Sequence, residues 1–183
     1  HFPQDIASWT TDINGQWTQG AEFLFNSGND PDTIIRLMRL PMMLLTLLLG
    51  VFLWRWARQQ FSERVANLAL FFFAFSPTFI THGRFVTTDV GAALAFFIGI
   101  IAFLNFLESP TPQRTLIAGI TFGVAELLKF SLILLIPIYA ILLLAWVLAR
   151  DPNAVASRLK LLGELVLKTA GIGLVGVGLI WTV

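Results

Sequence analysis

The sequence lacks cysteine and is poor in charged residues. Without cysteine there are no disulfide bonds and no thiolate metal sites. Charged residues make up 13% of the 183 residues, whereas soluble domains carry about 25%. No basic cluster interleaved with aromatic residues is present, which argues against a nucleic-acid partner. The P-loop, H-E-x-x-H, serine-elbow and N-x-[ST] patterns are also absent, so these common site motifs give no function.

Long apolar runs dominate what is present. Hydrophobic residues make up 56% of the chain, and its mean hydropathy is +0.78. A helix that crosses the hydrocarbon core needs about 20 residues. The composition therefore predicts an all-α, polytopic transmembrane helical bundle of about six membrane segments. We place these segments near residues 40–57, 66–81, 89–107, 115–129, 131–149 and 161–183, the second and fourth being short.

The two stretches between residues 115 and 149 are expected to form a hairpin. Its tip would carry Lys129, Phe130 and Ser131, and irregular backbone at membrane depth requires cover from protein or a wet cavity. The alternative is one continuous helix from 115 to 150. Pro137 disfavours this alternative because proline removes a helical hydrogen bond.

The first 38 residues differ in character from the rest. We expect residues 1–38 to be an extracytoplasmic loop segment and residues 39–183 to be a transmembrane helical domain truncated at both ends. The chain starts at His1 and ends at Val183 inside an apolar run. These ends predict a fragment of a longer protein, and no signal-peptide pattern is visible.

Turn and cap signals punctuate the N-terminal segment. Asn14-Gly15 and the stretch NSGNDPD are typical of turns. Asp30 followed by Pro31 predicts a helix that begins there, with Asp30 as its N-cap and proline at the first helical position. That helix would continue into the membrane.

Basic residues give the expected orientation. Short loops rich in Lys and Arg stay in the cytoplasm, and if the segments alternate, three such loops fall on one side. The other side then receives the N-terminal segment, the THGRFVTTD turn and Lys129. The cytoplasmic basic residues would be Arg55, Arg58, Arg64, Arg114, Arg150, Arg158 and Lys160.

The stretch THGRFVTTDV, residues 81–90, gathers three polar side chains at a membrane edge. Its structural interpretation is an Arg84–Asp89 pair that caps the third span, with Thr87 and Thr88 as equal cap candidates. Its functional interpretation is that Asp89 binds a metal or orients a substrate hydroxyl, while Arg84 holds a phosphate. His82 would be a base, a hydrogen-bond donor to the phosphate, or a polar residue at the membrane interface.

Lys129 lies between two strongly apolar stretches. It could pair with Glu126, three positions earlier on the same helix face. Alternatively, it would face a lipid phosphate at the rim of a cavity, as a point charge. The sequence leaves both interpretations open.

Glycine patterns predict helix packing rather than nucleotide binding. GIGLVG at 171–176 matches the dinucleotide G-x-G-x-x-G string, but that fingerprint needs a strand before it and a helix after it. Inside a membrane span, close helix packing is the better interpretation. The same applies to Gly119 and Gly123.

Three stretches share their order and spacing with one family of membrane enzymes. FLFNSGNDPDTIIRLMRLPMMLLTLLLG resembles the end of that family's first outer loop and its next span. SPTFITHGRFVTTDVGAALAFFIGIIAFLNFL resembles its second outer turn, which ends in an Asp, and LIAGITFGVAELLKFSLILLIPI resembles its glycine-containing helix followed by a Lys. The family is that of dolichyl-phosphate-mannose–protein mannosyltransferase-like enzymes of the GT-C superfamily (glycosyltransferase family 39-like). The resemblance covers residues 20–150 and is closest to bacterial enzymes.

The resemblance implies a glycosyltransferase of the plasma membrane whose active site faces outside. Such an enzyme moves a sugar from a polyprenyl phosphate to a protein, lipid or glycan acceptor. His82, Arg84 and Lys129 would then bind substrate, and Asp89 would position the acceptor or hold a divalent metal, since some relatives need metal and others do not. The family's catalytic Asp, usually followed by Glu, has no counterpart in Asp5 or Asp12. The resemblance therefore implies that this fragment alone is inactive.

Two other classes of protein remain open at this stage. A transporter would place broken helices and charges at the membrane midplane, and it predicts an internal repeat that the sequence does not contain. A structural membrane subunit without a site predicts that alanine at Arg84, Asp89 or Lys129 affects stability alone.

Overall fold

The computed structural model describes residues 1–149 and 155–182. Every regular element in this part of the chain is helical, which confirms the predicted all-α class. The N-terminal segment holds the short helices α1 and α2 and a π-helical turn at Glu22–Asn26. The elements are α1 Ala7–Thr10, α2 Gln16–Ala21, α3 Pro31–Gln60, α4 Glu63–Ala74, α5 Pro77–His82, α6 Asp89–Glu108, α7 Pro112–Leu128, a 3-10 helix at Phe130–Leu134, α8 Leu135–Ala149 and α9 Val155–Trp181.

Four of the described stretches are helices long and apolar enough to cross a membrane. They are Pro31–Gln60, Asp89–Glu108, Phe130–Ala149 and Arg158–Trp181. The other two predicted segments are shorter: residues 66–81 divide into α4 and α5, and α7 has 17 residues. Large apolar side chains remain exposed along these helices, as lipid contact requires, except on α6, whose apolar side chains are buried or half-buried.

The predicted helix start at Asp30 is confirmed. The Asp30 carboxylate accepts a hydrogen bond from the Asp32 backbone N–H at 3.2 Å and another from the Thr33 hydroxyl at 2.5 Å. Pro31 is the first helical residue. Gly28, with φ of 73°, makes the preceding turn in the left-handed region that glycine tolerates. Helix α3 then continues across residue 38 and through Pro41.

The chain reverses between α7 and α8, so the continuous-helix alternative is wrong. α7 ends at Leu128, and Lys129 has extended backbone with φ of −159° and ψ of 112°. A 3-10 turn follows before α8 begins at Leu135. Pro137 lies in the first turn of α8, where backbone N–H groups have no partner within the helix. The break therefore falls at Lys129, and the proline is accommodated.

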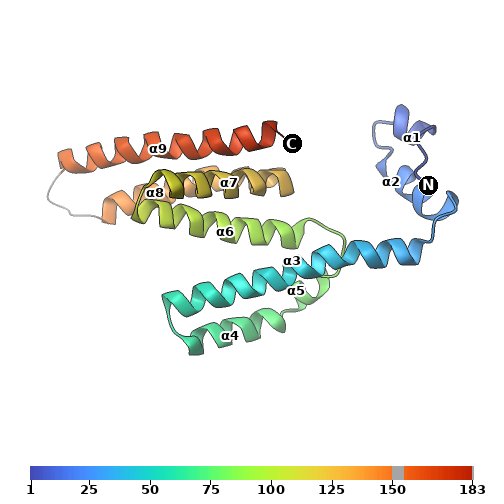
Figure 1. Cartoon of the computed structure of the whole chain (residues 1–183), viewed down its shortest axis with the longest axis horizontal. Coiled ribbons are helices and arrows are strands. Elements are labelled where there is room, and N and C mark those ends of the chain that lie inside the picture. Colours follow the sequence, from blue (N-terminus) through green and yellow to red (C-terminus); the bar gives the residue numbers. More distant parts are fainter. Residues whose placement is uncertain (150–154, 183) are drawn as a thin grey trace.

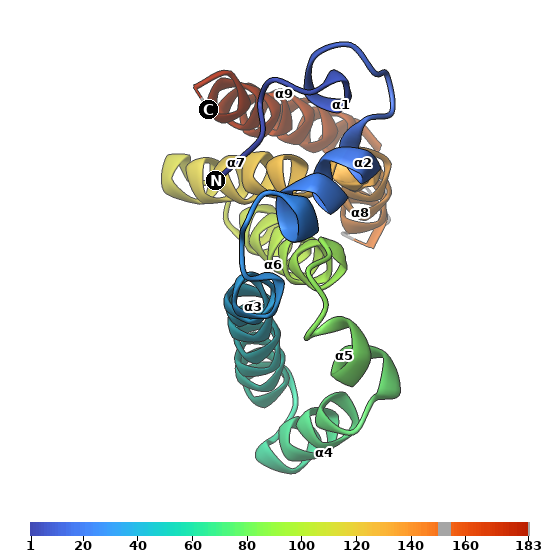
Figure 2. The same ribbon diagram turned by 90° about the vertical axis from the view of Figure 1, so that its right-hand side faces the viewer.

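Two groups of helices meet at α6. The larger core joins α6 to α7, α8 and α9, and its fully buried side chains include Phe103, Phe106 and Leu135. A smaller core joins α3 to α6 through Leu49, Val90 and Leu94. Figure 2 shows α3, α4 and α5 on one side of α6, with α7, α8 and α9 on the other.

Glycines bring α7 and α9 together, as predicted. A Cβ atom on Gly119 would lie 2.5 Å from Cβ of Val175, and one on Gly123 would lie 2.9 Å from the backbone oxygen of Gly176. A Cβ on Gly176 would lie 2.5 Å from the Phe122 ring. Gly173, in the same predicted motif, faces open space. The packing role thus belongs to three of these glycines and not to Gly173.

The connections gather at two ends of the bundle. Figure 1 shows the α3–α4 and α6–α7 connections at one end, and the N-terminal segment and the α5–α6 turn at the other. The first end carries Arg58, Arg64 and Arg114. Arg150, which we also expected in a cytoplasmic loop, lies outside the described residues.

Candidate functional site

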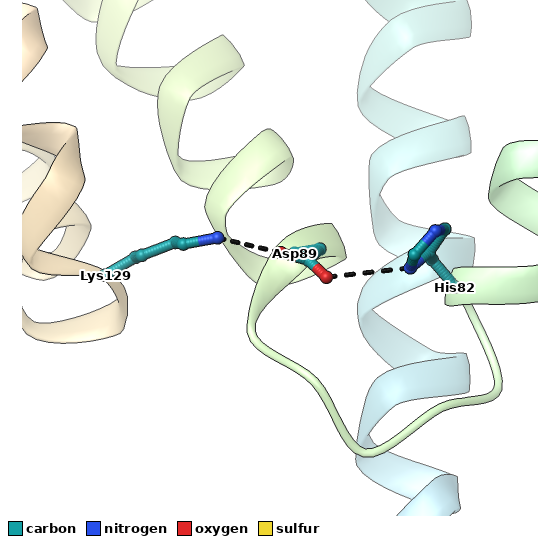
Figure 3. Close-up of polar contacts among 3 residues, drawn as sticks. All are labelled: His82, Asp89 and Lys129. Atoms are coloured by element: carbon teal, nitrogen blue, oxygen red, sulfur yellow. Dashed lines mark hydrogen bonds and ion pairs between the residues drawn. The ribbon is translucent and has the colours of Figure 1, made fainter.

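Three side chains from three separate segments meet at the end of the bundle that carries the α5–α6 turn. His82 is the last residue of α5, Asp89 is the first residue of α6, and Lys129 follows the last residue of α7. Lys129 Nζ donates a hydrogen bond to Asp89 Oδ1 at 2.8 Å, and His82 Nδ1 lies 3.6 Å from Asp89 Oδ2. Figure 3 shows the two nitrogen groups approaching the carboxylate from opposite sides. Asp89 is therefore the centre of the cluster.

The start of α6 fixes the Asp89 carboxylate. Thr88 is the N-cap residue, but its side chain makes no capping hydrogen bond. The start of α6 therefore does not depend on the Thr88 hydroxyl. Asp89 itself sits in the first turn, where the helix dipole favours a negative charge. Val90 and Gly91 behind it are buried, which anchors this turn against α3 and α7.

The turn after α7 delivers Lys129. Its backbone N–H still bonds to the Ala125 carbonyl at 3.0 Å, while its own carbonyl accepts the N–H of Leu132 at 2.9 Å. This change of direction sends the side chain away from α7 and across to α6. Lys129 consequently pairs with Asp89 rather than with Glu126, and the Glu126 Oε1 atom has no hydrogen-bond partner in the described structure.

The position of His82 depends on a close contact between the α5–α6 turn and α3. Thr46 on α3 donates its hydroxyl to the Met42 carbonyl at 2.8 Å and lies next to Gly83. A Cβ on Gly83 would lie 2.6 Å from the Phe79 carbonyl oxygen and 2.7 Å from Thr46 Oγ1. A larger residue would therefore force the turn to shift, so Gly83 helps to place the imidazole beside Asp89.

Arg84 does not join the cluster. Its guanidinium carbon lies 6.0 Å from the centroid of the Phe85 ring. Within the described residues, the cationic partner of Asp89 is Lys129, so the expected Arg84–Asp89 capping pair is not formed. Arg84 lies in the turn between His82 and Asp89, two positions after His82 in the sequence.

The cluster is accessible to solvent and adjoins an apolar cavity. The exposed fractions of the His82, Asp89 and Lys129 side chains are 44%, 46% and 39%. Lys129 also lines a cavity of about 550 Å³ between α3, α4, α5, α6 and the turn after α7. Its other walls are mostly apolar and aromatic, and include Leu49, Phe73, Phe79, Phe96 and Phe97.

The residues around Asp89 do not form a metal site on their own. Among the described residues, no group of three or more His, Cys, Asp or Glu side chains comes together. The nearest partner of Asp89 is an ammonium group, which carries no lone pair for a metal. The metal role of Asp89 stays a prediction.

Sequence reasoning missed Thr46 and Gly83, which position the turn. A hydroxyl on an apolar span and a glycine beside a histidine were the available signals, but neither is specific. Asp89, His82 and Lys129 were found because each is a polar residue at the edge of an apolar run.

Comparison with known families gives one match. The family model described as "Dolichyl-phosphate-mannose-protein mannosyltransferase" matches residues 32–180, a range that includes the whole cluster. No curated protein and no solved structure matches the chain.

Proposed function

The chain belongs to the dolichyl-phosphate-mannose-protein mannosyltransferase family, and we propose that it transfers a sugar from a polyprenyl-phosphate donor to a protein, lipid or glycan acceptor outside the cytoplasm. Family membership supports a glycosyltransferase in general, and four apolar helices support an integral membrane protein. One observation carries the finer proposal. Lys129 belongs both to the polar cluster and to the wall of an apolar cavity.

A lipid-linked sugar phosphate needs two kinds of surface at one place. Its isoprenoid tail needs apolar walls, which Leu49, Phe79 and Phe96 supply in the cavity beside the cluster. Its phosphate needs a cation, and Lys129, which lines this cavity and is partly exposed to solvent, carries one. Arg84, in the adjacent turn, would provide a second cation whose planar fork suits phosphate oxygens.

The reaction exchanges one bond at the anomeric carbon. The acceptor oxygen bonds to this carbon, the bond from the carbon to the phosphate oxygen breaks, and the electron pair leaves with polyprenyl phosphate. The hydroxyl proton of the acceptor passes to a carboxylate base, a role that the resemblance gives to the family's catalytic Asp, for which Asp5 and Asp12 are no counterpart. Because the leaving group is already anionic, the protein mainly stabilises phosphate charge and orients the acceptor. We assign the first task to Lys129 and Arg84 and the second to Asp89.

The distribution of basic residues supports an extracytoplasmic site. Arg58, Arg64 and Arg114 lie at the end of the bundle away from the cluster, and short basic loops stay in the cytoplasm. The cluster would then face outward. By resemblance to the bacterial enzymes, the membrane would be the bacterial plasma membrane.

Transfer assays with the full-length protein test this proposal. The protein is reconstituted in liposomes with radiolabelled polyprenyl-phosphate sugars, and wild type is compared with Asp89→Asn and Arg84→Ala. We expect transfer to fall about 10- to 100-fold in each variant, the range for losing a hydrogen bond to a charged group. Normal transfer by folded variants would contradict the assigned residues. Transfer from a nucleotide sugar without lipid would contradict the donor.

A further inference from the structure

Lys129 has two competing uses in the proposed reaction. It is paired with Asp89 at 2.8 Å, and it is the ammonium at the cavity that would meet the donor phosphate. One ammonium cannot give its full charge to both anions. The Asp89 carboxylate would therefore compete with the phosphate for this charge.

We propose that the Asp89–Lys129 ion pair is a latch that the donor opens: lipid phosphate displaces Asp89 from Lys129 and thereby frees the carboxylate for the acceptor. This inference rests on the proposed function and adds an order of events to it. Donor binding comes first and breaks the pair. Asp89 becomes available to an acceptor hydroxyl only afterwards, so the acceptor is not oriented before a donor is present.

The surroundings of the pair suit such an exchange. Both side chains are well exposed, with fractions of 39% for Lys129 and 46% for Asp89. Ion pairs with this much solvent contact are weak and are easily exchanged. Lysine also carries its charge on a flexible stem with several rotatable bonds, so the ammonium can turn toward the cavity without movement of α7.

His82 provides a second partner for the released carboxylate. Its Nδ1 atom lies 3.6 Å from the Asp89 oxygen that Lys129 does not hold, and this nitrogen has no hydrogen-bond partner. The distance is too long for a hydrogen bond. A small movement of Asp89 away from Lys129 would shorten it, so the imidazole would hold the free carboxylate beside the acceptor.

The latch makes an unusual prediction for one substitution. Asp89→Asn keeps the size of the side chain and removes its charge. If Asp89 competes with phosphate, this variant binds the lipid phosphate more tightly than wild type although it transfers sugar more slowly. If Asp89 instead holds Lys129 ready for phosphate, the same variant binds more weakly.

Binding measurements on the full-length protein distinguish these cases. The protein is placed in nanodiscs of zwitterionic lipid, and farnesyl phosphate is titrated as the probe. We expect Asp89→Asn to lower Kd about two- to fivefold, the range that an exposed ion pair can account for. We expect Lys129→Met to raise Kd. In the double variant, adding Asp89→Asn to Lys129→Met should lower Kd by a smaller factor than Asp89→Asn lowers it in wild type.

Glu108→Gln is the matched control. Glu108 ends the same helix that Asp89 begins, and its carboxylate lies 3.8 Å from an Arg114 nitrogen in a comparable exposed pair. Its removal lowers the negative charge equally but should leave Kd unchanged. Steady-state transfer adds a second readout, in which Asp89→Asn should lower both kcat and the KM for the donor.

Each outcome decides a different claim. An unchanged or weaker Kd in Asp89→Asn, with wild type binding farnesyl phosphate normally, would overturn the latch and leave the proposed function standing. The absence of any farnesyl phosphate binding by wild type and Asp89→Asn alike would overturn the proposed function itself. A Glu108→Gln variant that gains as much as Asp89→Asn would reduce the effect to net charge and also overturn the latch.

Discussion

The helices on the two sides of α6 are packed differently. On the α7–α9 side, backbone approaches backbone at Gly123 and Gly176, and Phe103 and Leu135 are fully buried. On the α3–α5 side, contact with α6 depends on a smaller core around Leu49. The first side therefore has the larger core and a backbone contact between helices, whereas the second side has the smaller core.

This difference explains the geometry of the cluster. Asp89 and Lys129 both belong to the tightly packed side, since α6 and α7 share the larger core, and they pair at 2.8 Å. His82 belongs to the other side and stands 3.6 Å away. The tightly packed side therefore sets the ion pair, whereas the looser side sets the distance of the imidazole.

The largest effect should come from the ammonium of the tightly packed side. Lys129→Met removes the phosphate partner and should lower sugar transfer about 10- to 100-fold, the cost of a lost hydrogen bond to a charged group. Stability should change little because exposed ion pairs contribute little. Transfer assays and thermal unfolding in detergent measure the two effects. A large loss of stability with normal transfer by the folded fraction would place Lys129 in the packing instead.

The glycine contacts can be broken without touching the cluster. Gly123→Ala would put a Cβ 2.9 Å from the Gly176 carbonyl oxygen, and overpacking of this kind costs about 1–3 kcal/mol. Gly173→Ala, a change to a glycine that faces open space, is the control and should not destabilise the protein. Thermal unfolding of both variants in the same detergent checks this. Equal melting temperatures for the two variants would contradict the close α7–α9 contact.

A change with a smaller expected effect tests the α3–α5 side of α6. Gly83→Ala would place a Cβ 2.6 Å from the Phe79 carbonyl oxygen, so the turn must shift and carry His82 with it. We expect transfer to fall about two- to fivefold, in proportion to a lost interaction of about 0.5–1 kcal/mol. Gly91→Ala is the control, because its Cβ would meet only ordinary contacts from 3.5 Å. Similar transfer rates in the two variants would show that the turn does not position the imidazole.

The smallest effect concerns the first turn of α3, which lies outside both cores. The hydroxyl of Thr33 donates to Asp30 and lowers the pKa of that carboxyl below its ordinary value. A carboxyl with a lowered folded pKa stabilises the fold above its unfolded pKa of about 4, and this contribution disappears as pH falls through the folded pKa. The protection factors of the amides of residues 32–35, which take the slower intrinsic exchange in acid into account, should therefore fall as the pH falls. Asp30→Asn should remove the pH dependence, and an unaltered dependence in that variant would assign it to another group.

The sequence predicted elements more reliably than partners. The cap at Asp30, the helix start at Asp89 and the reversal at Lys129 all follow from local signals, namely a cap residue, a polar break and a short apolar run. Asp89 and Lys129 are 40 positions apart, so their pairing depends on how α6 and α7 pack. Local spacing favoured Glu126 as the partner of Lys129 and Arg84 as the partner of Asp89. It could not predict that Asp89 and Lys129 pair with each other.

Glycine motifs show the same limit. The string GIGLVG indicated close packing, but only the fold separates Gly176 from Gly173. A Cβ on Gly176 would meet the Phe122 ring, whereas one on Gly173 would meet no atom within 4 Å. The division of residues 66–81 into α4 and α5 had a usable signal in Ser76-Pro77, since proline favours the start of a helix. Because the whole stretch is apolar, hydropathy alone indicated one continuous segment.

The antiparallel arrangement of α6 and α7 places opposite helix termini side by side. The end of α7 leaves its last backbone carbonyls without helical partners, and the beginning of α6 leaves its first N–H groups in the same condition. The lysine thus lies at an electronegative terminus and the aspartate at an electropositive one. Each residue offsets the partial charge at the terminus of its own helix, and the ion pair between them links the two antiparallel helices at this end. A ligand that draws the ammonium away would leave the carbonyl terminus of α7 without this positive charge, so the end of α7 should become more electronegative when the site is occupied.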